Sequence, residues 1–137
     1  MDKLIYTFNN RSSKNHLNNK EILGGKGANL IQMAKLGLPV PPGFIISTKV
    51  CEYFYKNDKK VLKKIFKQIN KEIKIIEKLS KKKFGDLSSP LLVSVRSGAR
   101  ISMPGMMDTI LNIGLNDKTV VALKNKTSNG RFAKDSY

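Results

Sequence analysis

The alternation of apolar and polar positions predicts short strands mixed with helices in the first part of the chain. Residues 3–8 alternate in the manner of a strand, and the almost wholly polar residues 9–20 are expected to form a loop. After the glycines at 24–27, apolar residues recur about every 3.6 positions, which predicts a helix. Gly37 is placed to cap the C-terminus of that helix, because glycine adopts a positive φ without a side-chain clash.

The middle of the chain predicts one strand and two helices. Residues 39–43 contain three prolines and exclude a continued helix, and residues 44–47 form a short apolar run typical of a buried strand. Ser47 or Thr48 can cap the next helix, at about 49–56. A longer helix is expected at about 58–80. Its apolar residues form one stripe: Val61, Leu62, Ile65, Ile69, Ile73, Ile76 and Leu79.

The last third of the chain predicts a strand, a long glycine-containing loop and a second strand. These three elements cover residues 91–95, 96–108 and 109–113, and a helix follows at 118–125. The whole pattern indicates an α/β or α+β domain. Residues 131–137 resemble the opening of a further helix, so we expect the chain to be a piece of a longer protein.

Composition narrows the class of protein. The chain has 137 residues, of which 40% are apolar, and its single cysteine excludes a disulfide scaffold and a multi-cysteine metal site. No apolar run is long enough to span a bilayer, and the first residues lack the pattern of a signal peptide. A cytoplasmic location is therefore expected.

The formal net charge of +16 comes mainly from lysine, because only four of the 26 basic residues are arginines. Residues 56–83 contain twelve lysines against three acidic residues. Proteins that recognise nucleic-acid sequence depend strongly on arginine, so the composition argues against a specific nucleic-acid partner. We expect the lysines to form a solvated helix face, with non-specific contact to a polyanion or an anionic membrane as the alternative.

The sequence Gly-Gly-Lys-Gly at 24–27 is the first candidate for chemistry. Glycines ahead of a helix let backbone N–H groups converge, and Lys26 adds a full positive charge, which together suit a phosphate group. The spacing is not that of a Walker A loop. From the motif alone, a glycine-rich turn with an exposed lysine is the slightly favoured interpretation.

The segment from Arg96 to Thr109 is the second candidate. Arg96 follows an apolar strand, and Arg96 and Arg100 are half of the arginines in a chain that otherwise uses lysine. A planar guanidinium can hold phosphate oxygens through two parallel hydrogen bonds. Gly98 and Gly105 would let this loop close over a ligand. The methionines of the loop, Met103, Met106 and Met107, would equally suit packing on the core.

Two other residue types have simpler explanations. His16 stands in a polar loop, where a solvated side chain is expected rather than a catalytic one. Cys51 lies among aromatic residues on the predicted helix 49–56, and we expect it to be a buried small apolar residue rather than a nucleophile.

Two long stretches resemble the nucleotide-binding region of the pyruvate, phosphate dikinase family. The first covers residues 23–30 and 36–44, which include Gly-Gly-Lys-Gly and Pro-Val-Pro-Pro-Gly-Phe. The second covers residues 91–100 and 102–109, with Val-Arg-Ser and Met-Pro-Gly-Met-Met-Asp-Thr. Residues 131–137 are also similar to the family's continuation. The resemblance extends over about residues 21–137.

The resemblance implies the N-terminal subdomain of an ATP-grasp fold, a short mixed sheet with flanking helices, truncated before the fold is complete. Residues 1–137 would form a partial nucleotide-binding domain, with a lysine-rich variable helix at about 58–83. The family's central phosphohistidine domain and its C-terminal pyruvate and phosphoenolpyruvate domain are not present in this sequence.

Enzymes of this family convert ATP, phosphate and pyruvate to AMP, diphosphate and phosphoenolpyruvate. The resemblance implies that Lys26 and Arg96 contact the ATP phosphates as catalytic and binding residues. It also implies that the loop around Gly105, Met106 and Met107 holds the terminal phosphates through its backbone. Mg²⁺ is expected for the parent enzyme, with its ligands outside this chain.

The implied partners are ATP, and phosphate and pyruvate through the missing domains. We expect no specific nucleic acid, no membrane partner and a homo-oligomeric parent enzyme. We also expect that the 137 residues alone do not perform the full reaction. The alternatives are a fragment of a pyruvate, water dikinase, a non-enzymatic polyanion-binding module and a degraded remnant.

Overall fold

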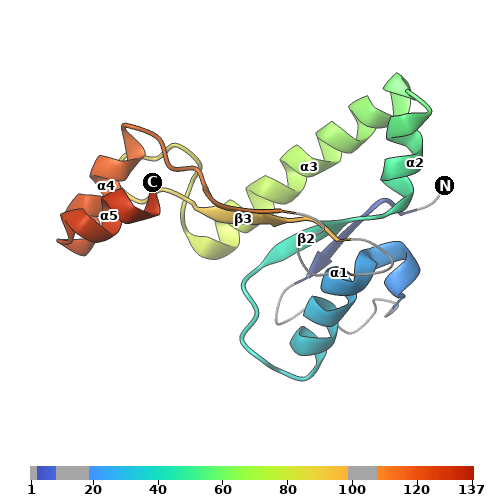
Figure 1. The fold of residues 1–137 in the computed structure, drawn as a ribbon, viewed down its shortest axis with the longest axis horizontal. Coiled ribbons are helices and arrows are strands. Elements are labelled where there is room, and N and C mark those ends of the chain that lie inside the picture. Colours follow the sequence, from blue (N-terminus) through green and yellow to red (C-terminus); the bar gives the residue numbers. More distant parts are fainter. Residues whose placement is uncertain (1–2, 9–18, 99–107) are drawn as a thin grey trace. The chain divides into compact units, whose positions relative to one another are not determined.

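The computed structural model describes residues 3–8, 19–98 and 108–137. The chain divides into two units, the first formed by residues 1–76 and 97–107 and the second by residues 77–96 and 108–137. In the described residues each unit holds one antiparallel pair of strands together with helices (Figure 1). The expected mixture of strands and helices is confirmed, but the single mixed sheet is wrong, because two separate antiparallel pairs are found instead.

The sheet of the first unit joins strands that are far apart in sequence. Strand β1 (Ile5–Phe8) pairs with β2 (Gly43–Ile46), with Ile5 opposite Ile46 and Phe8 opposite Gly43. Glycine is required at position 43, because a Cβ there would lie 2.5 Å from the Cζ atom of Phe8. Both strands confirm the predicted positions to within two residues.

Helix α1 (Lys20–Lys35) supplies most of the core of the first unit. Ala28 and Ile31 are fully buried, and small residues on this face allow the helix to approach the sheet closely. The buried cluster consists of Phe8, Leu23, Ala28, Ile31, Ala34, Val40 and Ile45. This cluster fixes the position of α1 against β1 and β2.

Both ends of α1 have capping interactions. The side chain of Asn19 accepts a hydrogen bond from the backbone N–H of Glu21 at 2.8 Å. At the other end, Gly37 has a φ of 77°, its N–H donates to the carbonyl of Ala34, and the N–H of Leu38 donates to Met33. This is a Schellman arrangement, which confirms the predicted capping role of Gly37.

Helix α2 (Lys49–Tyr55) contributes no buried residue to the core. The expectation that Cys51 is buried is therefore wrong, because its side chain is exposed. A seven-residue helix has only two turns, and its aromatic residues Phe54 and Tyr55 also face solvent. The aromatic neighbours of Cys51 were thus a misleading sign of burial.

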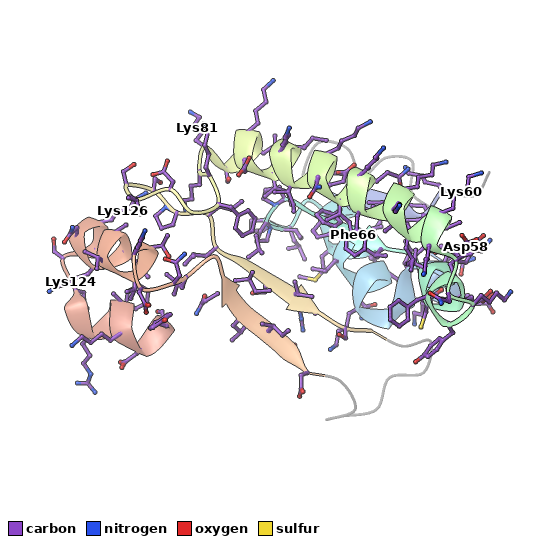
Figure 2. The ribbon with its side chains drawn as sticks, turned by 90° about the horizontal axis from the view of Figure 1, so that it is seen from above. Asp58, Lys60, Phe66, Lys81, Lys124 and Lys126 are labelled. Carbon is purple, nitrogen blue, oxygen red and sulfur yellow. The ribbon has the colours of Figure 1, made fainter. Side chains whose placement is uncertain are left out.

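Helix α3 (Lys59–Ser80) has the predicted two faces. Ile65 and Ile76 are buried on the apolar stripe, and the carboxylate of Asp58 caps the helix by accepting the N–H of Val61 at 3.0 Å. Lysine side chains such as Lys60 extend from the outer side of the helix (Figure 2).

Within the described residues, no helix combines the length and the apolar character needed to cross a membrane.

The second unit contains the strands β3 (Val93–Arg96) and β4 (Thr109–Ile113) and the helices α4 (Thr119–Thr127) and α5 (Gly130–Ser136). All four elements confirm predictions, with β3 beginning two residues later than expected. Thr119 is 1% exposed, and its hydroxyl donates to the carbonyl of Gly114 at 2.8 Å. Gly114 has a φ of 115°, and a Cβ there would lie 2.3 Å from the carbonyl oxygen of Leu91.

The turn before β3 is organised by the carboxylate of Asp86. One of its oxygens accepts hydrogen bonds from the hydroxyl and the N–H of Ser88, both at 2.7 Å, and from the N–H of Ser89 at 2.9 Å. The hydroxyl of Ser88 makes the largest contribution to lowering the pKa of Asp86 from 3.8 to about 2, and the two N–H groups add to it. The ionised form of Asp86 is therefore favoured by the fold.

Replacing Asp86 by asparagine should lower the free energy of unfolding at pH 7. The folded pKa lies below the unfolded value, so the stability from ionised Asp86 is fully present above about pH 4 and is lost as the pH falls towards 2. Urea denaturation of wild type and Asp86→Asn from pH 7 to pH 2 measures this. The difference in free energy of unfolding between the two proteins should become smaller as the pH falls from about 4 to 2. Asp135→Asn, with the same change of charge, is the control. If the free energy of unfolding lost in Asp86→Asn does not change with pH, the proposed role of the carboxylate is wrong.

Candidate functional site

The glycine-rich segment lies at a break inside α1. The prediction that the glycines precede the helix needs correction, because helical structure already begins at Lys20. Gly24, however, has a φ of 69° and a ψ of 164°, so the helix is two helical segments merged across a kink. The second segment begins at Gly25, and its first turn contains Lys26 and Gly27. Only glycine adopts such a backbone conformation readily, which explains residue 24.

The three glycines of this segment have different surroundings. A Cβ on Gly27 would lie 3.1 Å from Cγ2 of Ile45, so the absent side chain lets α1 pack closely on β2. A Cβ on Gly25 would meet no atom of the described residues within 4 Å. Gly24 and Gly27 are therefore explained by the fold itself, whereas no contact within the described part of the chain explains Gly25.

Lys26 follows Gly25 in the chain and is half-buried. A Cβ on Gly98 would lie 3.9 Å from the Cβ of Lys26, so the chain that leaves β3 passes next to this lysine in the first unit. Among the described residues, the Lys26 ammonium has no ion pair or hydrogen bond. The structure thus brings together the glycine-rich segment and the beginning of the second candidate loop.

Arg96 is the last residue of β3 and lies opposite Thr109 of β4. The sequence predicts Arg96 at the end of the strand 91–95, as the first residue of the loop, and the structure includes it in the strand. Its side chain is exposed. A shift of register between Val93 and Val95 marks an irregularity in the strand shortly before it. Arg96 belongs to the second unit and Lys26 to the first.

The remaining predicted site residues lie outside the described residues. Gly105, Met106 and Met107 fall in the segment 99–107, together with Arg100 and Met103, and His16 falls in the segment 9–18. Their roles stay predictions.

Sequence reasoning missed how the segment before Gly24 is held in place. The N–H of Thr48 donates to the carbonyl of Ile22 at 2.9 Å, and the Thr48 hydroxyl donates to the carbonyl of Glu21. The sequence predicts Ser47 or Thr48 as the cap of α2. The side chain of Thr48 makes no capping hydrogen bond, whereas the Ser47 hydroxyl accepts the N–H of Lys49 at 3.3 Å. The actual role of Thr48 is to tie the start of α2 to the first turn of α1, and no sequence pattern signals a contact of this separation.

A magnesium site was expected only outside this chain. In residues 3–8, 19–98 and 108–137, no group of three or more histidine, cysteine, aspartate or glutamate side chains could hold a metal ion.

The first half of the chain matches a model of a known domain family. Residues 20–83, which include the glycine break, Lys26 and the whole of α3, match the family model "Pyruvate phosphate dikinase, AMP/ATP-binding domain". The matched segment thus contains the first candidate site but not Arg96.

Whole-chain similarity identifies the family. A pyruvate, phosphate dikinase of Entamoeba histolytica is 59% identical over 119 residues, which are 87% of this chain and 13% of that protein. The dikinase of Clostridium symbiosum is 50% identical over 137 residues, or 100% of this chain and 15% of the relative. A chloroplastic pyruvate, phosphate dikinase of Flaveria pringlei is 50% identical over 135 residues, which are 98% of this chain and 14% of that protein. The chain belongs to the pyruvate, phosphate dikinase family, and it spans about one seventh of the length of these relatives.

Alanine substitutions at Gly25 and Gly27 should change the stability of the fold in opposite directions. Gly25→Ala should raise the free energy of unfolding by about 0.5–1 kcal/mol, because alanine favours the helix and its Cβ meets no neighbour. Gly27→Ala should be less stable than wild type, because Ile45 must move to admit the Cβ. Urea denaturation of both variants measures this, and equal effects would contradict the assignment of Gly27 to packing.

Proposed function

We propose that this chain forms part of the ATP-binding domain of a pyruvate, phosphate dikinase, an ATP-grasp domain in which Lys26 and Arg96 hold the nucleotide phosphates. The observation on which this rests is that no atom of the described residues lies within 4 Å of a Cβ placed on Gly25, next to Lys26 and at the start of a helical segment. A glycine that the fold does not require, beside an available ammonium group, suits a ligand that approaches the backbone closely.

The physical case for a phosphate at this point has three parts. The first turn of a helical segment presents N–H groups that lack a regular acceptor four residues earlier, and it bears a partial positive charge. The absence of a side chain at Gly25 lets an anionic oxygen reach those N–H groups. Lys26 then adds a full charge, in a half-buried position where screening by water is reduced.

Arg96 supplies a different kind of contact. Its guanidinium presents paired N–H donors in one plane, which match two oxygens of a phosphate group. At the end of β3 the side chain extends from a hydrogen-bonded strand, so its base is held while its end stays exposed. In phosphoryl transfer, such positioned cations stabilise the negative charge that spreads over the transferred group.

The full reaction would convert ATP, phosphate and pyruvate to AMP, diphosphate and phosphoenolpyruvate in a protein of the length of the relatives. Within it, this chain would bind the nucleotide phosphates, with the backbone around Gly105, Met106 and Met107 as a further phosphate contact. The remaining steps, including those that need Mg²⁺, would depend on parts of the protein beyond these 137 residues.

A chimaeric enzyme tests the two cations in a complete protein. This chain would replace the matching 137 residues of the Clostridium symbiosum dikinase, to which it is 50% identical. Lys26→Ala and Arg96→Ala should each lower the rate of ATP-dependent phosphorylation by about a hundredfold, since each removes a contact to developing charge. Lys20→Ala and Arg131→Ala, two exposed cations with the same loss of charge, should leave the rate within about twofold. Normal phosphorylation in Lys26→Ala and Arg96→Ala would overturn the proposal.

A direct binding measurement distinguishes this proposal from a polyanion-binding module formed by the exposed lysines of α3. Gly25→Ala should weaken ATP binding to the full 137-residue chain by about tenfold while its folded state is retained, because the methyl group occupies the space of the phosphate. Calorimetric titration with ATP at two salt concentrations measures this. Binding that is unchanged in Gly25→Ala and falls steeply with salt would instead favour the lysine face.

A further inference from the structure

The break at Gly24 interrupts the ladder of backbone hydrogen bonds in α1. In a continuous α-helix, the N–H of Gly25 would donate to the carbonyl of Glu21. The N–H of Lys26 would donate in the same way to the carbonyl of Ile22. The φ of 69° and the ψ of 164° at Gly24 are not helical, so neither pair keeps the geometry of a continuous helix.

Thr48 donates to both of these carbonyls. Its N–H donates to the carbonyl of Ile22 at 2.9 Å, and its hydroxyl donates to the carbonyl of Glu21. The two donors of Thr48 therefore take the places that the N–H groups of Gly25 and Lys26 would have in a continuous helix. Backbone carbonyls need hydrogen-bond partners, so these two bonds stabilise the break.

Strand β2 and the residues that follow it hold α1 on both sides of the break. Thr48 comes two residues after β2 and holds the first helical segment. Ile45 of β2 packs against the second segment, where a Cβ on Gly27 would lie 3.1 Å from its Cγ2 atom. One strand therefore fixes the two helical segments relative to each other.

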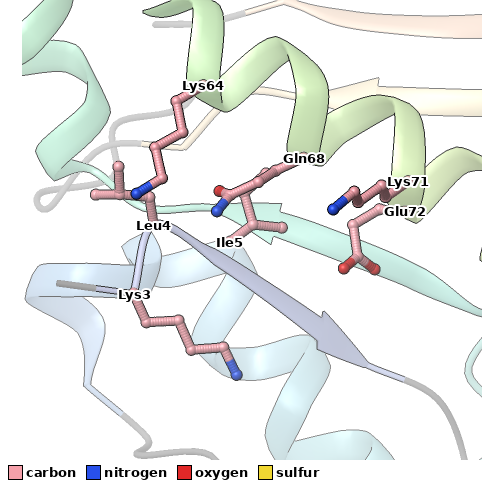
Figure 3. Close-up of a pocket in the computed structure, with 7 residues that line it drawn as sticks. All are labelled: Lys3, Leu4, Ile5, Lys64, Gln68, Lys71 and Glu72. Carbon is pink, nitrogen blue, oxygen red and sulfur yellow. The ribbon is translucent and has the colours of Figure 1, made fainter. Parts of the chain in front are cut away.

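The end of β2 is itself anchored on β1. The N–H of Ser47 donates to the carbonyl of Leu4 at 2.9 Å, directly before β1 begins. From α3, the carboxylate of Glu72 accepts a hydrogen bond from the Thr7 hydroxyl at 2.8 Å and points towards β1 in Figure 3. Thr48 therefore acts on α1 from a supported position rather than from a free loop.

We propose that Thr48 is a positioning residue of the nucleotide site, which keeps the N–H groups of Gly25 and Lys26 available to the phosphates. This role rests on the proposed function, in which the phosphates bind at these two residues. The first N–H groups of a helical segment have no acceptor four residues earlier, and an anionic oxygen can accept from them. If the Thr48 hydroxyl is removed, the carbonyl of Glu21 competes with the phosphate for the N–H of Gly25. The donors are then no longer preorganised, and binding weakens.

Three variants of the full chain test this role by calorimetric titration with ATP. Thr48→Val has a similar shape and lacks the hydroxyl, so it should weaken ATP binding by about tenfold. Thr48→Ser keeps a hydroxyl and should bind ATP within about twofold of wild type. Ser47→Ala is the matched control. It removes the neighbouring hydroxyl, which accepts the N–H of Lys49 at 3.3 Å, and should also bind ATP within about twofold of wild type.

Amide hydrogen exchange without ligand tests the geometry separately. Relative to the amide of the buried Ile31, the Gly25 amide should exchange more slowly in Thr48→Val than in wild type. The reason is that the Glu21 carbonyl, without its partner from Thr48, becomes an acceptor for this amide. A fold that is merely destabilised would instead exchange faster at both amides.

Wild-type ATP affinity in Thr48→Val would overturn the inference, and so would an equal loss of affinity in Thr48→Ser or Ser47→Ala. An unchanged relative exchange rate of the Gly25 amide in Thr48→Val would overturn it as well. If Thr48→Val does not fold, Thr48→Ala replaces it. Lys26→Ala distinguishes these results from a failure of the proposed function. Weaker binding in Lys26→Ala with unchanged binding in Thr48→Val refutes only the role of Thr48, whereas unchanged binding in Lys26→Ala refutes the phosphate site itself.

Discussion

Close packing of α1 on the strand β2 is the constraint on which the first unit depends. It leaves little room for a side chain at position 27, where a Cβ would lie 3.1 Å from Ile45, and it buries Ala28 and Ile31 completely. The same packing fixes the helix on either side of the break at Gly24, where the backbone takes a conformation that favours glycine. Lys26 is therefore held at a set position by a buried surface, although its own side chain is not part of the core. A binding group on a packed helix is more precisely positioned than one on a free loop.

Much of the fold follows from local patterns in the sequence. The apolar stripe of α3, the cap at Gly37 and the strand at Thr109–Ile113 could be predicted because each depends on residues within one or two turns of each other. The kink at Gly24 could not, because a glycine in a helical pattern is compatible with a continuous helix as well as with a break. The burial of Cys51 was predicted wrongly. Its aromatic neighbours suggested a buried position, but α2 contains no buried residue and Cys51 is exposed.

Sequence reasoning could predict candidate residues of the site but not the space around them. Residue types predict Lys26 and Arg96 as candidates, because a glycine-rich helix start and an arginine at a strand end both suit phosphate. What distinguishes Gly25 from Gly27 is the surrounding space, which depends on β2 and cannot be inferred from the motif.

The central claim is that nucleotide phosphates bind at the start of the second helical segment of α1. Titrating the isotope-labelled full chain with ATP and, separately, with adenosine tests it most directly, because the two ligands differ only in the phosphates. The account predicts that the backbone amide signals of Gly25, Lys26 and Gly27 shift with ATP and not with adenosine. Shifts confined to the lysine face of α3, with those three signals unchanged, would contradict it.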